Sequence, residues 1–425
     1  MKTVNLHQLF DKSNETRKNI IKTIGDYKTP EPKTGSSFFI HLSELCPVAC
    51  KHCMYSSDLT AKSVKDALNK DDIEYAIKFI NDSQSQKLNI TGGGEPFLKF
   101  GNILRLVESV KTPVVEIVTA GNWARTENRA RSVLLQLENA RRKNSNLQEL
   151  RLRLSLDRYH IEAPRPVTLT HYANVARAWS KANTQIGLGY RGIQPDMGIV
   201  DEQLATLLGG YVRAVDDCNR VIIFNDNKKL PINFNVMRFS GAATGLQTDK
   251  ELAENTMSIA EYYQPYEKEP GQLTLATTVN DAIKTGYVAS EGVAITLNSD
   301  GEYWIFAGTA PDRKLMLGNQ TFNESIAHFY KDPITRFLVT DGIWALAELV
   351  SKLNRTNYEL ALVKNDMAFF VEDLLADPKV RLAVTLLVLQ SQAQKNEIKL
   401  SDQFEYAEIL NTPTNELMDL FVEQI

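Results

Sequence analysis

Cysteine is scarce in this sequence, with only four among 425 residues. A small secreted domain held by disulfides uses more cysteines at wider spacing, so that class of protein is excluded. Long apolar runs are missing too, since the most apolar stretch, residues 380–389, is about half as long as a bilayer span requires. Residues 1–19 also lack the apolar core of a secretion signal. We therefore expect no membrane span and a cytoplasmic location.

A strong excess of charge of one sign is absent as well. The formal net charge is −4, from 48 Lys and Arg residues against 52 Asp and Glu residues. Proteins that bind nucleic acid through its phosphates are usually basic, so no nucleic-acid partner is predicted. Hydrophobic residues make up 43% of the chain, which is long enough to bury a sizeable core without disulfides.

Short apolar runs alternate with amphipathic segments up to about residue 240. The alternation predicts an α/β sheet or an open barrel of six strands with helical crossovers. The predicted strands are 37–42, 87–91, 114–119, 150–155, 184–189 and 232–238. The predicted helices between them are 71–83, 100–110, 125–143, 168–181 and 201–216.

The pattern changes after residue 240, where helical periodicity dominates. Helices are predicted at 246–263, 344–353, 358–375 and 381–390. Residues 292–306 read as a β-hairpin, with 298–301 at its turn. The C-terminal part is therefore expected to be mostly helical and to contain one hairpin.

Three of the four cysteines lie within eight residues, at Cys46, Cys50 and Cys53. This C-x3-C-x2-C segment follows the first predicted strand, and α/β folds place their sites at the C-terminal ends of strands. Three thiolates would leave one corner of a four-iron cluster open to a small ligand. A zinc ion is the alternative, with His52 or His41 as the fourth ligand.

Glycine or short polar residues follow two later strands. Residues 91–96 read Thr-Gly-Gly-Gly-Glu-Pro, and glycines let the backbone approach a ligand closely. Ser155 and Asp157 share one face at the end of the fourth strand, because side chains alternate along a strand. His160 follows them and would lie at the mouth of a site. The alternatives are a glycine turn that closes a strand and a helix cap.

The cysteine segment resembles the signature of the radical S-adenosylmethionine (SAM) superfamily, including a ring-bearing residue, His52, before the third cysteine. Residues 92–96 resemble the G-G-E-P motif of that superfamily. Ser155 and Asp157 resemble its S-x-D motif, and the turn at Asn122 resembles its T-N-G turn. Residues 235–243 resemble its sixth-strand segment more loosely.

This resemblance implies a partial (β/α)6 radical SAM barrel over residues 36–245, between an N-terminal helical segment, 1–35, and a C-terminal region, 246–425. It implies that Cys46, Cys50 and Cys53 hold one [4Fe–4S] cluster. The residues expected to contact SAM are Gly92, Gly93, Gly94, Glu95, Asn122, Ser155 and Asp157.

The hairpin at 292–306 resembles that of the SPASM or twitch extensions, which carry further clusters on cysteines. Here the corresponding stretch, 303–307, has none, so one cluster per chain is predicted, with Trp304 and Phe306 filling the space. Cys218 cannot hold a cluster alone. It is a candidate hydrogen-atom donor or a small buried residue, and His160 is a candidate catalytic residue or a structural histidine.

The resemblance implies reductive cleavage of SAM and abstraction of a hydrogen atom from a substrate. The substrate is expected to be a peptide, as in the modification of ribosomal peptides, or a small metabolite such as a sugar or nucleotide. An electron-donor protein such as flavodoxin or ferredoxin is the expected partner. A protein that binds an iron–sulfur cluster or zinc without catalysis is the alternative from another class.

Overall fold

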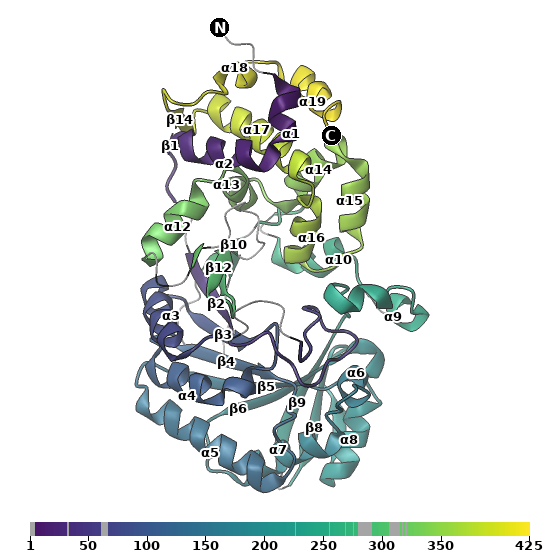
Figure 1. Ribbon diagram of the computed structural model, residues 1–425. Helices are drawn as coiled ribbons and strands as arrows, with labels where there is room; N and C mark the ends of the chain where they lie inside the picture. The colour runs from purple at the N-terminus through teal and green to yellow at the C-terminus, as the bar shows by residue number, and fades with distance from the viewer. Residues whose placement is uncertain are drawn as a thin grey trace.

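The computed structural model describes most of the chain. The described residues are 5–31, 34–60, 67–225, 227–254, 256–267, 269–274, 276–278, 291–305, 315–316, 318 and 321–425. They form an α/β part built on one large sheet and a mostly helical part that contains both chain ends (Figure 1). None of the described helices is long and apolar enough to cross a bilayer.

Six parallel strands lie side by side in chain order, which confirms the α/β class and the predicted order. Among the described strands the sheet stays open, with β7 and β13 at its edges. Because the six strands run the same way, the loops after them meet at one edge, which we call the C-terminal edge. The strands are β2 (Thr34–His41), β3 (Lys87–Thr91), β4 (Val114–Thr119), β5 (Glu149–Ser155), β6 (Gly187–Ile193) and β9 (Lys228–Asn235).

Helices connect these strands and cover one face of the sheet (Figure 1). On that face every second strand residue is apolar and buried, such as Leu150, Leu152 and Leu154 on β5. The main core therefore lies between sheet and helices. The crossover helices are α3 (Lys70–Ser83), α4 (Phe100–Ser109), α5 (Glu127–Lys143), α7 (Leu169–Lys181) and α8 (Val200–Leu208).

The opposite face of the sheet carries charged side chains. Glu116 on β4 accepts hydrogen bonds from Lys87 Nζ at 3.2 Å and Arg153 Nε at 3.0 Å. Burial would raise the pKa of Glu116, but the positive charges of Arg153 and Lys87 outweigh it and lower that pKa to about 2. This face of the sheet is therefore polar and ionised.

Two strand predictions were displaced along the chain. The fifth strand was expected at 184–189, but β6 covers Gly187–Ile193. Thr184 Oγ1 donates a hydrogen bond to Glu138 of α5 at 2.9 Å and accepts one from the Ile186 amide at 3.1 Å. These bonds hold the preceding residues in a turn against α5. The last strand, expected at 232–238, begins and ends earlier as β9.

The helix predicted at 201–216 was wrong in its second half. α8 ends at Leu208, because Gly209 takes a left-handed conformation, φ 69°, that closes the helix. Two antiparallel strands follow, β7 (Tyr211–Ala214) and β8 (Asn219–Phe224), and β8 pairs with β9. They extend the sheet beyond its parallel strands.

The predicted hairpin forms near the edge of the sheet that lies opposite to β7. β11 (Glu291–Leu297) and β12 (Glu302–Ile305) are antiparallel, and the Gly301 amide donates to the Asn298 carbonyl at 3.0 Å across the turn. β11 also pairs in parallel with β2, so the hairpin continues the sheet. β10 (Ala276–Thr278) and β13 (Leu315–Met316) flank it. The side chain of Trp304 and all of Phe306 lie outside the described residues.

The helical part combines the two ends of the chain. Two N-terminal helices, α1 (Leu6–Asp11) and α2 (Ser13–Thr23), contact α17 (Pro378–Gln394). β1 (Gly25–Tyr27) pairs with β14 (Ile398–Leu400). The other helices of this part are α12 (Phe322–Tyr330), α13 (Pro333–Thr340), α14 (Ile343–Leu353), α15 (Arg355–Leu362), α16 (Met367–Leu374), α18 (Ala407–Leu410) and α19 (Thr414–Val422).

Two long helix predictions were wrong because caps interrupt them. The segment expected as helix 246–263 contains α9 (Lys250–Glu254) and α10 (Ile259–Tyr263), and a capping box at Ser258 starts the second. The segment expected as helix 358–375 divides into α15 and α16, because Asp366 caps the start of α16. The predicted divisions at residues 35 and 245 stay predictions.

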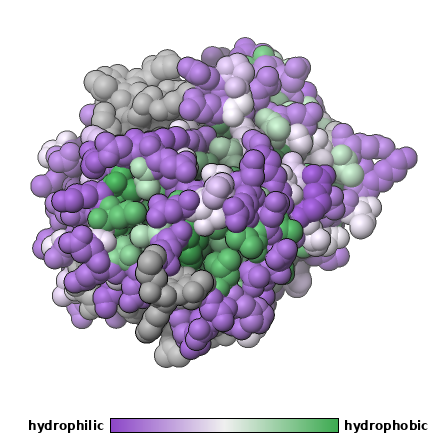
Figure 2. Space-filling model, turned by 90° about the horizontal axis from the view of Figure 1, so that it is seen from above, coloured by the Kyte–Doolittle hydropathy of each residue, from purple (hydrophilic) through white to green (hydrophobic). Residues whose placement is uncertain are grey.

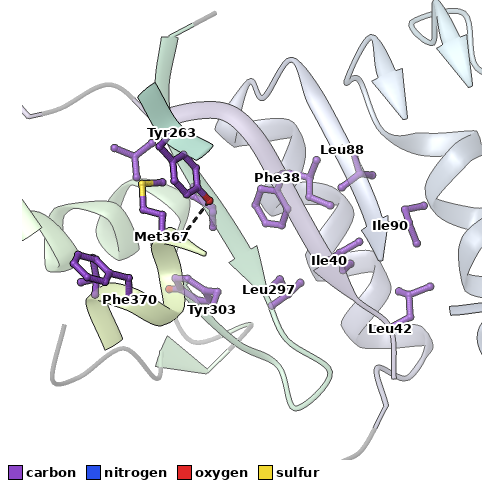
Figure 3. Close-up of a cluster of buried hydrophobic side chains, with 14 of the residues drawn as sticks. Phe38, Ile40, Leu42, Leu88, Ile90, Tyr263, Leu297, Tyr303, Met367 and Phe370 are labelled. Atoms are coloured by element: carbon purple, nitrogen blue, oxygen red, sulfur yellow. Dashed lines mark hydrogen bonds between the residues drawn. The ribbon is translucent and has the colours of Figure 1, made fainter. Parts of the chain in front are cut away.

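Apolar side chains join the helical part to the sheet (Figure 3). Phe38, Ile40 and Leu42 on and after β2 lie beside Leu88 and Ile90 of β3, and all five are buried. Tyr263, Met367 and Phe370 approach the same region from α10 and α16, with the Met367 amide donating to Tyr263 Oη at 3.2 Å.

Seen from the helical end, the surface is mainly hydrophilic, with apolar residues gathered toward its middle (Figure 2).

Candidate functional site

The three clustered cysteines lie in the loop after β2, which we call the cluster loop (residues 42–58). The Cys53 amide donates to the Cys50 carbonyl at 3.2 Å, and the Ser57 amide donates to Cys53 Sγ at 3.3 Å. A hydrogen bond between Cys50 and Cys53 lowers the pKa of Cys53, as do the Ser57 and Tyr55 amides, and raises the pKa of Cys50. All three cysteines are partly buried free thiols. The loop thus gathers three sulfur donors at the C-terminal edge of the sheet.

The glycine segment after β3 pairs with the cluster loop through its backbone. The Gly94 amide donates to the Ser43 carbonyl at 2.8 Å, and the Glu95 amide donates to the Leu45 carbonyl at 2.9 Å. A Cβ on Gly94 would lie 2.2 Å from the Leu45 carbonyl oxygen, so this close approach requires glycine. A Cβ on Gly93 would lie 3.7 Å from its nearest atom, Ser57 Oγ, which is an ordinary van der Waals distance, so this position does not require glycine for packing reasons.

Glu95 ties the ends of β3 and β4 together. One carboxylate oxygen accepts hydrogen bonds from Thr119 Oγ1 at 2.6 Å and the Phe97 amide at 3.0 Å, and the other accepts from the Ala120 amide at 2.9 Å. The residue is 3% exposed. Burial raises its pKa although these bonds oppose the shift. Both oxygens have protein donors, and the contact of Glu95 with SAM stays a prediction.

Asp157 joins the fourth strand's end to the cluster loop. It caps α6 (Arg158–Ile161) through the His160 amide at 3.0 Å, and it contacts His160 Nδ1 at 2.8 Å and His52 Nε2 at 3.2 Å. Burial would raise its pKa, but the charges and hydrogen bonds of the two histidines outweigh this and hold the pKa well below the usual range. One carboxylate therefore fixes two imidazoles beside the cysteines.

Each of the two histidines keeps one ring nitrogen that does not contact Asp157. His160 Nε2 lies 4.0 Å from Cys50 Sγ. His52 stacks on Tyr159 at a centroid distance of 4.9 Å, and its buried Nδ1 has no hydrogen-bond partner among the described residues. The sequence predicted Asp157 and His160 but missed the bond between His52 and Asp157. The two residues are far apart in the chain, and no local pattern links them.

Further predicted residues reach the same edge. Ser155 ends β5 and lies opposite Arg191 of β6 in the sheet register. Asn122 follows the left-handed Gly121 after β4, and its buried Oδ1 has no hydrogen-bond partner in the described ranges.

Cys218 lies before β8 and therefore at the C-terminal edge, since β8 runs opposite to its neighbour β9. Its carbonyl accepts the Phe234 amide at 2.7 Å, and its Sγ accepts Gln194 Nε2 at 3.5 Å. It shares the edge with the other cysteines but belongs to a different loop. Its catalytic role, like that of His160, stays a prediction.

The donor set fits a sulfur-ligated cluster. Three free thiols share one loop, and Glu44 Oε2, His52 Nδ1 and Asn122 Oδ1 are buried polar atoms that lack a partner in the described part. A compact group of Cys50, His52 and His160, with one donor atom each within 4.8 Å, would also suit a zinc ion. His41 lies outside this group and contacts Asn298 Oδ1 through Nδ1 at 3.3 Å, and burial lowers its pKa to about 4.

Residues 34–138 match the family model described as a 4Fe-4S single cluster domain. The matched range contains the cluster loop and the glycine segment that pairs with it. Over residues 34–138 the chain is therefore similar to a domain that holds one [4Fe–4S] cluster.

Solved structures with some similarity to the chain include two of anSMEcpe with bound AdoMet. One, the hexahistidine-tagged form, is 12% identical and covers 91% of this chain and 98% of its own, with a TM-score of 0.41. The native form is 13% identical over 85% and 99%, with a TM-score of 0.40. HydG, a maturase of the [FeFe]-hydrogenase, is 14% identical, with a TM-score of 0.26. That match covers 48% of this chain and 44% of HydG. No curated protein matches the sequence.

Proposed function

We propose that the protein reductively cleaves SAM at one [4Fe–4S] cluster held by Cys46, Cys50 and Cys53 and then abstracts a hydrogen atom from a substrate. The observation that carries this proposal is the cluster loop itself, which gathers three free thiols and is paired through its backbone to the glycine segment. Three thiolates leave one iron of four without a protein ligand, and a chelating amino acid suits that vacancy.

When bound, the cluster and SAM supply the electron and the radical that the reaction needs. The chain's own residues hold and shield them. The backbone bonds from Gly94 and Glu95 fix the position of the cluster loop. Asp157 fixes the orientation of His52 and His160, and these rings line the site and limit the access of water.

The proposed SAM contacts come from loops that meet at the C-terminal edge. Gly93 has no side chain that would hinder the close approach of a ligand, and Asn122 offers an oxygen without a partner in the described part of the chain. Gly92, Gly94 and Glu95 complete the segment that would hold the amino end of SAM. Ser155 and Asp157, with Arg191 beside Ser155, complete the opposite side.

The proposed substrate is a peptide, and the alternative is a small metabolite such as a sugar or nucleotide. The SPASM-like hairpin supports the peptide through its resemblance to those extensions, and it lies beside β2, the strand directly before the cluster loop. We propose one cluster per chain, since Cys218 is the single cysteine outside the loop. We further propose a flavodoxin or ferredoxin as electron donor and a cytoplasmic location.

Anaerobic reconstitution of the purified protein tests the proposal. We expect about four irons per chain, an electron paramagnetic resonance (EPR) signal of a reduced [4Fe–4S] cluster, and formation of 5′-deoxyadenosine from SAM with dithionite. Triple replacement of Cys46, Cys50 and Cys53 by alanine should abolish all three. Cys218→Ala is the matched control for iron content, which it should leave unchanged. An iron content near eight would contradict the single cluster.

A second candidate function is metal binding without catalysis, which the compact group of Cys50, His52 and His160 favours. Elemental analysis of protein purified without added metal separates the two candidates. One zinc per chain, with no 5′-deoxyadenosine after reconstitution with iron and sulfide, would support the second candidate and overturn the first.

A further inference from the structure

The segment after β9 lies directly against the third cluster cysteine. The Ala242 amide donates to the Cys53 carbonyl at 2.9 Å. Gly241 has a φ of +55°, and a Cβ there would lie 2.2 Å from the Met54 carbonyl oxygen. The chain thus makes backbone-to-backbone contact with the cluster loop. We call residues 237–242 the buttress segment.

The helical part holds the buttress segment from its other side. The Asn365 side chain donates through Nδ2 to the Met237 carbonyl at 2.6 Å and accepts at Oδ1 from the Phe239 amide at 3.1 Å. Asn365 lies between α15 and α16 and is 3% exposed. A neutral amide offers a donor and an acceptor at once, whereas aspartate and alanine do not. Both hydrogen bonds therefore depend on the identity of this residue.

Neighbouring contacts reinforce the same junction. Asp366 forms an ion pair with Arg238 of the buttress segment and caps α16 through the Ala368 amide at 3.0 Å. The ring of Tyr55, two residues after Cys53, lies 6.3 Å from that of Phe369 on α16. The helical part thus contacts the cluster loop along two routes, and the route through Asn365 begins with two buried hydrogen bonds.

We propose that Asn365 is a positioning residue for the cluster. Its amide sets the register of the buttress segment, and that segment fixes the backbone at Cys53. The helical part then helps to determine how firmly the third cysteine is held. This inference rests on the proposed function only for the identity of the metal group.

Hydrogen–deuterium exchange of the apoprotein tests the mechanical link. In Asn365→Ala, we expect amides of residues 50–57 and 236–244 to exchange at least tenfold faster than in the wild type. Asn354→Ala is the matched control. Asn354 caps α15 through the Asn357 amide at 3.1 Å, so its loss weakens the same helical part without touching the buttress segment. It should leave the exchange of both peptides unchanged.

The reconstituted protein gives the second readout. In Asn365→Ala we expect at least threefold faster loss of the cluster to a chelator and an altered EPR line shape. Asn365→Asp keeps the acceptor for Phe239 but sets a carboxylate oxygen against the Met237 carbonyl, so it should also speed amide exchange and cluster loss. The proposal is overturned if Asn365→Asp and Asn365→Ala show the amide exchange rates and the cluster lifetime of the wild type. It is also overturned if Asn354→Ala changes both quantities as much as Asn365→Ala does.

The two proposals fail in different ways. Should Asn365→Ala not fold, the exchange and cluster lifetime of Asn365→Asp alone decide the matter. If the wild type holds no four-iron cluster, the proposed function fails, while the exchange experiment still tests the link between Asn365 and Cys53.

Discussion

The α/β part and the helical part are held together by contacts of very different range. In the α/β part, the six parallel strands from β2 to β9 lie side by side in the order in which they follow along the chain. In the helical part, β1 near the start of the chain pairs with β14 near its end, and Arg17 binds Asp332. Local sequence patterns therefore reveal the first part, whereas the second depends on pairings that no local pattern encodes.

The largest expected effect is on the helical part. Arg17 donates to both oxygens of Asp332, at 2.7 and 2.8 Å, and to Thr385 at 2.7 Å, and Arg17 and Asp332 are each 1% exposed. Arg17→Ala leaves a buried carboxylate without its partner, so the free energy of unfolding should fall by about 3–5 kcal/mol. Urea unfolding of the apoprotein measures this.

Arg105→Ala is the control from the α/β part. It breaks an exposed ion pair with Glu74, formed at 2.6 Å, and should cost far less, because water and salt screen exposed charges. If Arg17→Ala and Arg105→Ala lower the free energy of unfolding equally, the buried ion pair between distant residues does not stabilise the protein more than the exposed one, and the comparison of the two parts fails.

A second change should disturb the α/β part alone. Gly94→Ala forces a Cβ against the Leu45 carbonyl and should cost about 1–3 kcal/mol through overpacking. Because the cluster loop must shift, we expect less than half of the wild-type iron after reconstitution. Gly101→Ala on α4 meets nothing within 4 Å, and replacing a helical glycine should stabilise by up to about 1 kcal/mol. Full iron binding by Gly94→Ala would contradict the tight pairing.

The smallest expected effect concerns pH. Glu116 has a pKa lowered from 4.5 to about 2 in the folded protein, so its contribution is complete above pH 4.5 and is lost as the pH falls toward 2. The wild type should lose about 1 kcal/mol through this group by pH 4 and about 2 kcal/mol by pH 3. Glu116→Gln should lack this component. Urea unfolding midpoints of the wild-type and Glu116→Gln apoproteins at pH 6, 4 and 3 measure this difference. If the midpoints of both proteins fall by the same amount with pH, the prediction is wrong.

The sequence predicted the parallel sheet well because each strand is a short apolar run between amphipathic helices. β3 and β4 begin and end where expected. The β7–β8 hairpin was missed because the helical pattern of α8 was extended past Gly209, although a glycine at that place can end a helix. The break before α16 also had a local indication, the capping Asp366.

Within the candidate site, too, local patterns in the sequence indicated some features, and others became visible only in the structure. Their spacing made the three cysteines candidate ligands, and its composition made the glycine segment a candidate binding segment. The contacts that fix them were not predictable, because Asp157 reaches His52 and Asn365 reaches Met237 across more than a hundred residues. Such contacts arise only when separate loops meet at one edge of a folded sheet.

The pairing of β1 with β14 has a consequence for biosynthesis. A ribosome must make about 400 residues before β1 can find its partner, and α2 must wait for α17 in the same way. The sheet can form while Phe10, Ile20 and Ile21 still face water. The nascent chain therefore carries an exposed apolar segment for most of its synthesis, which makes it a natural client for a chaperone.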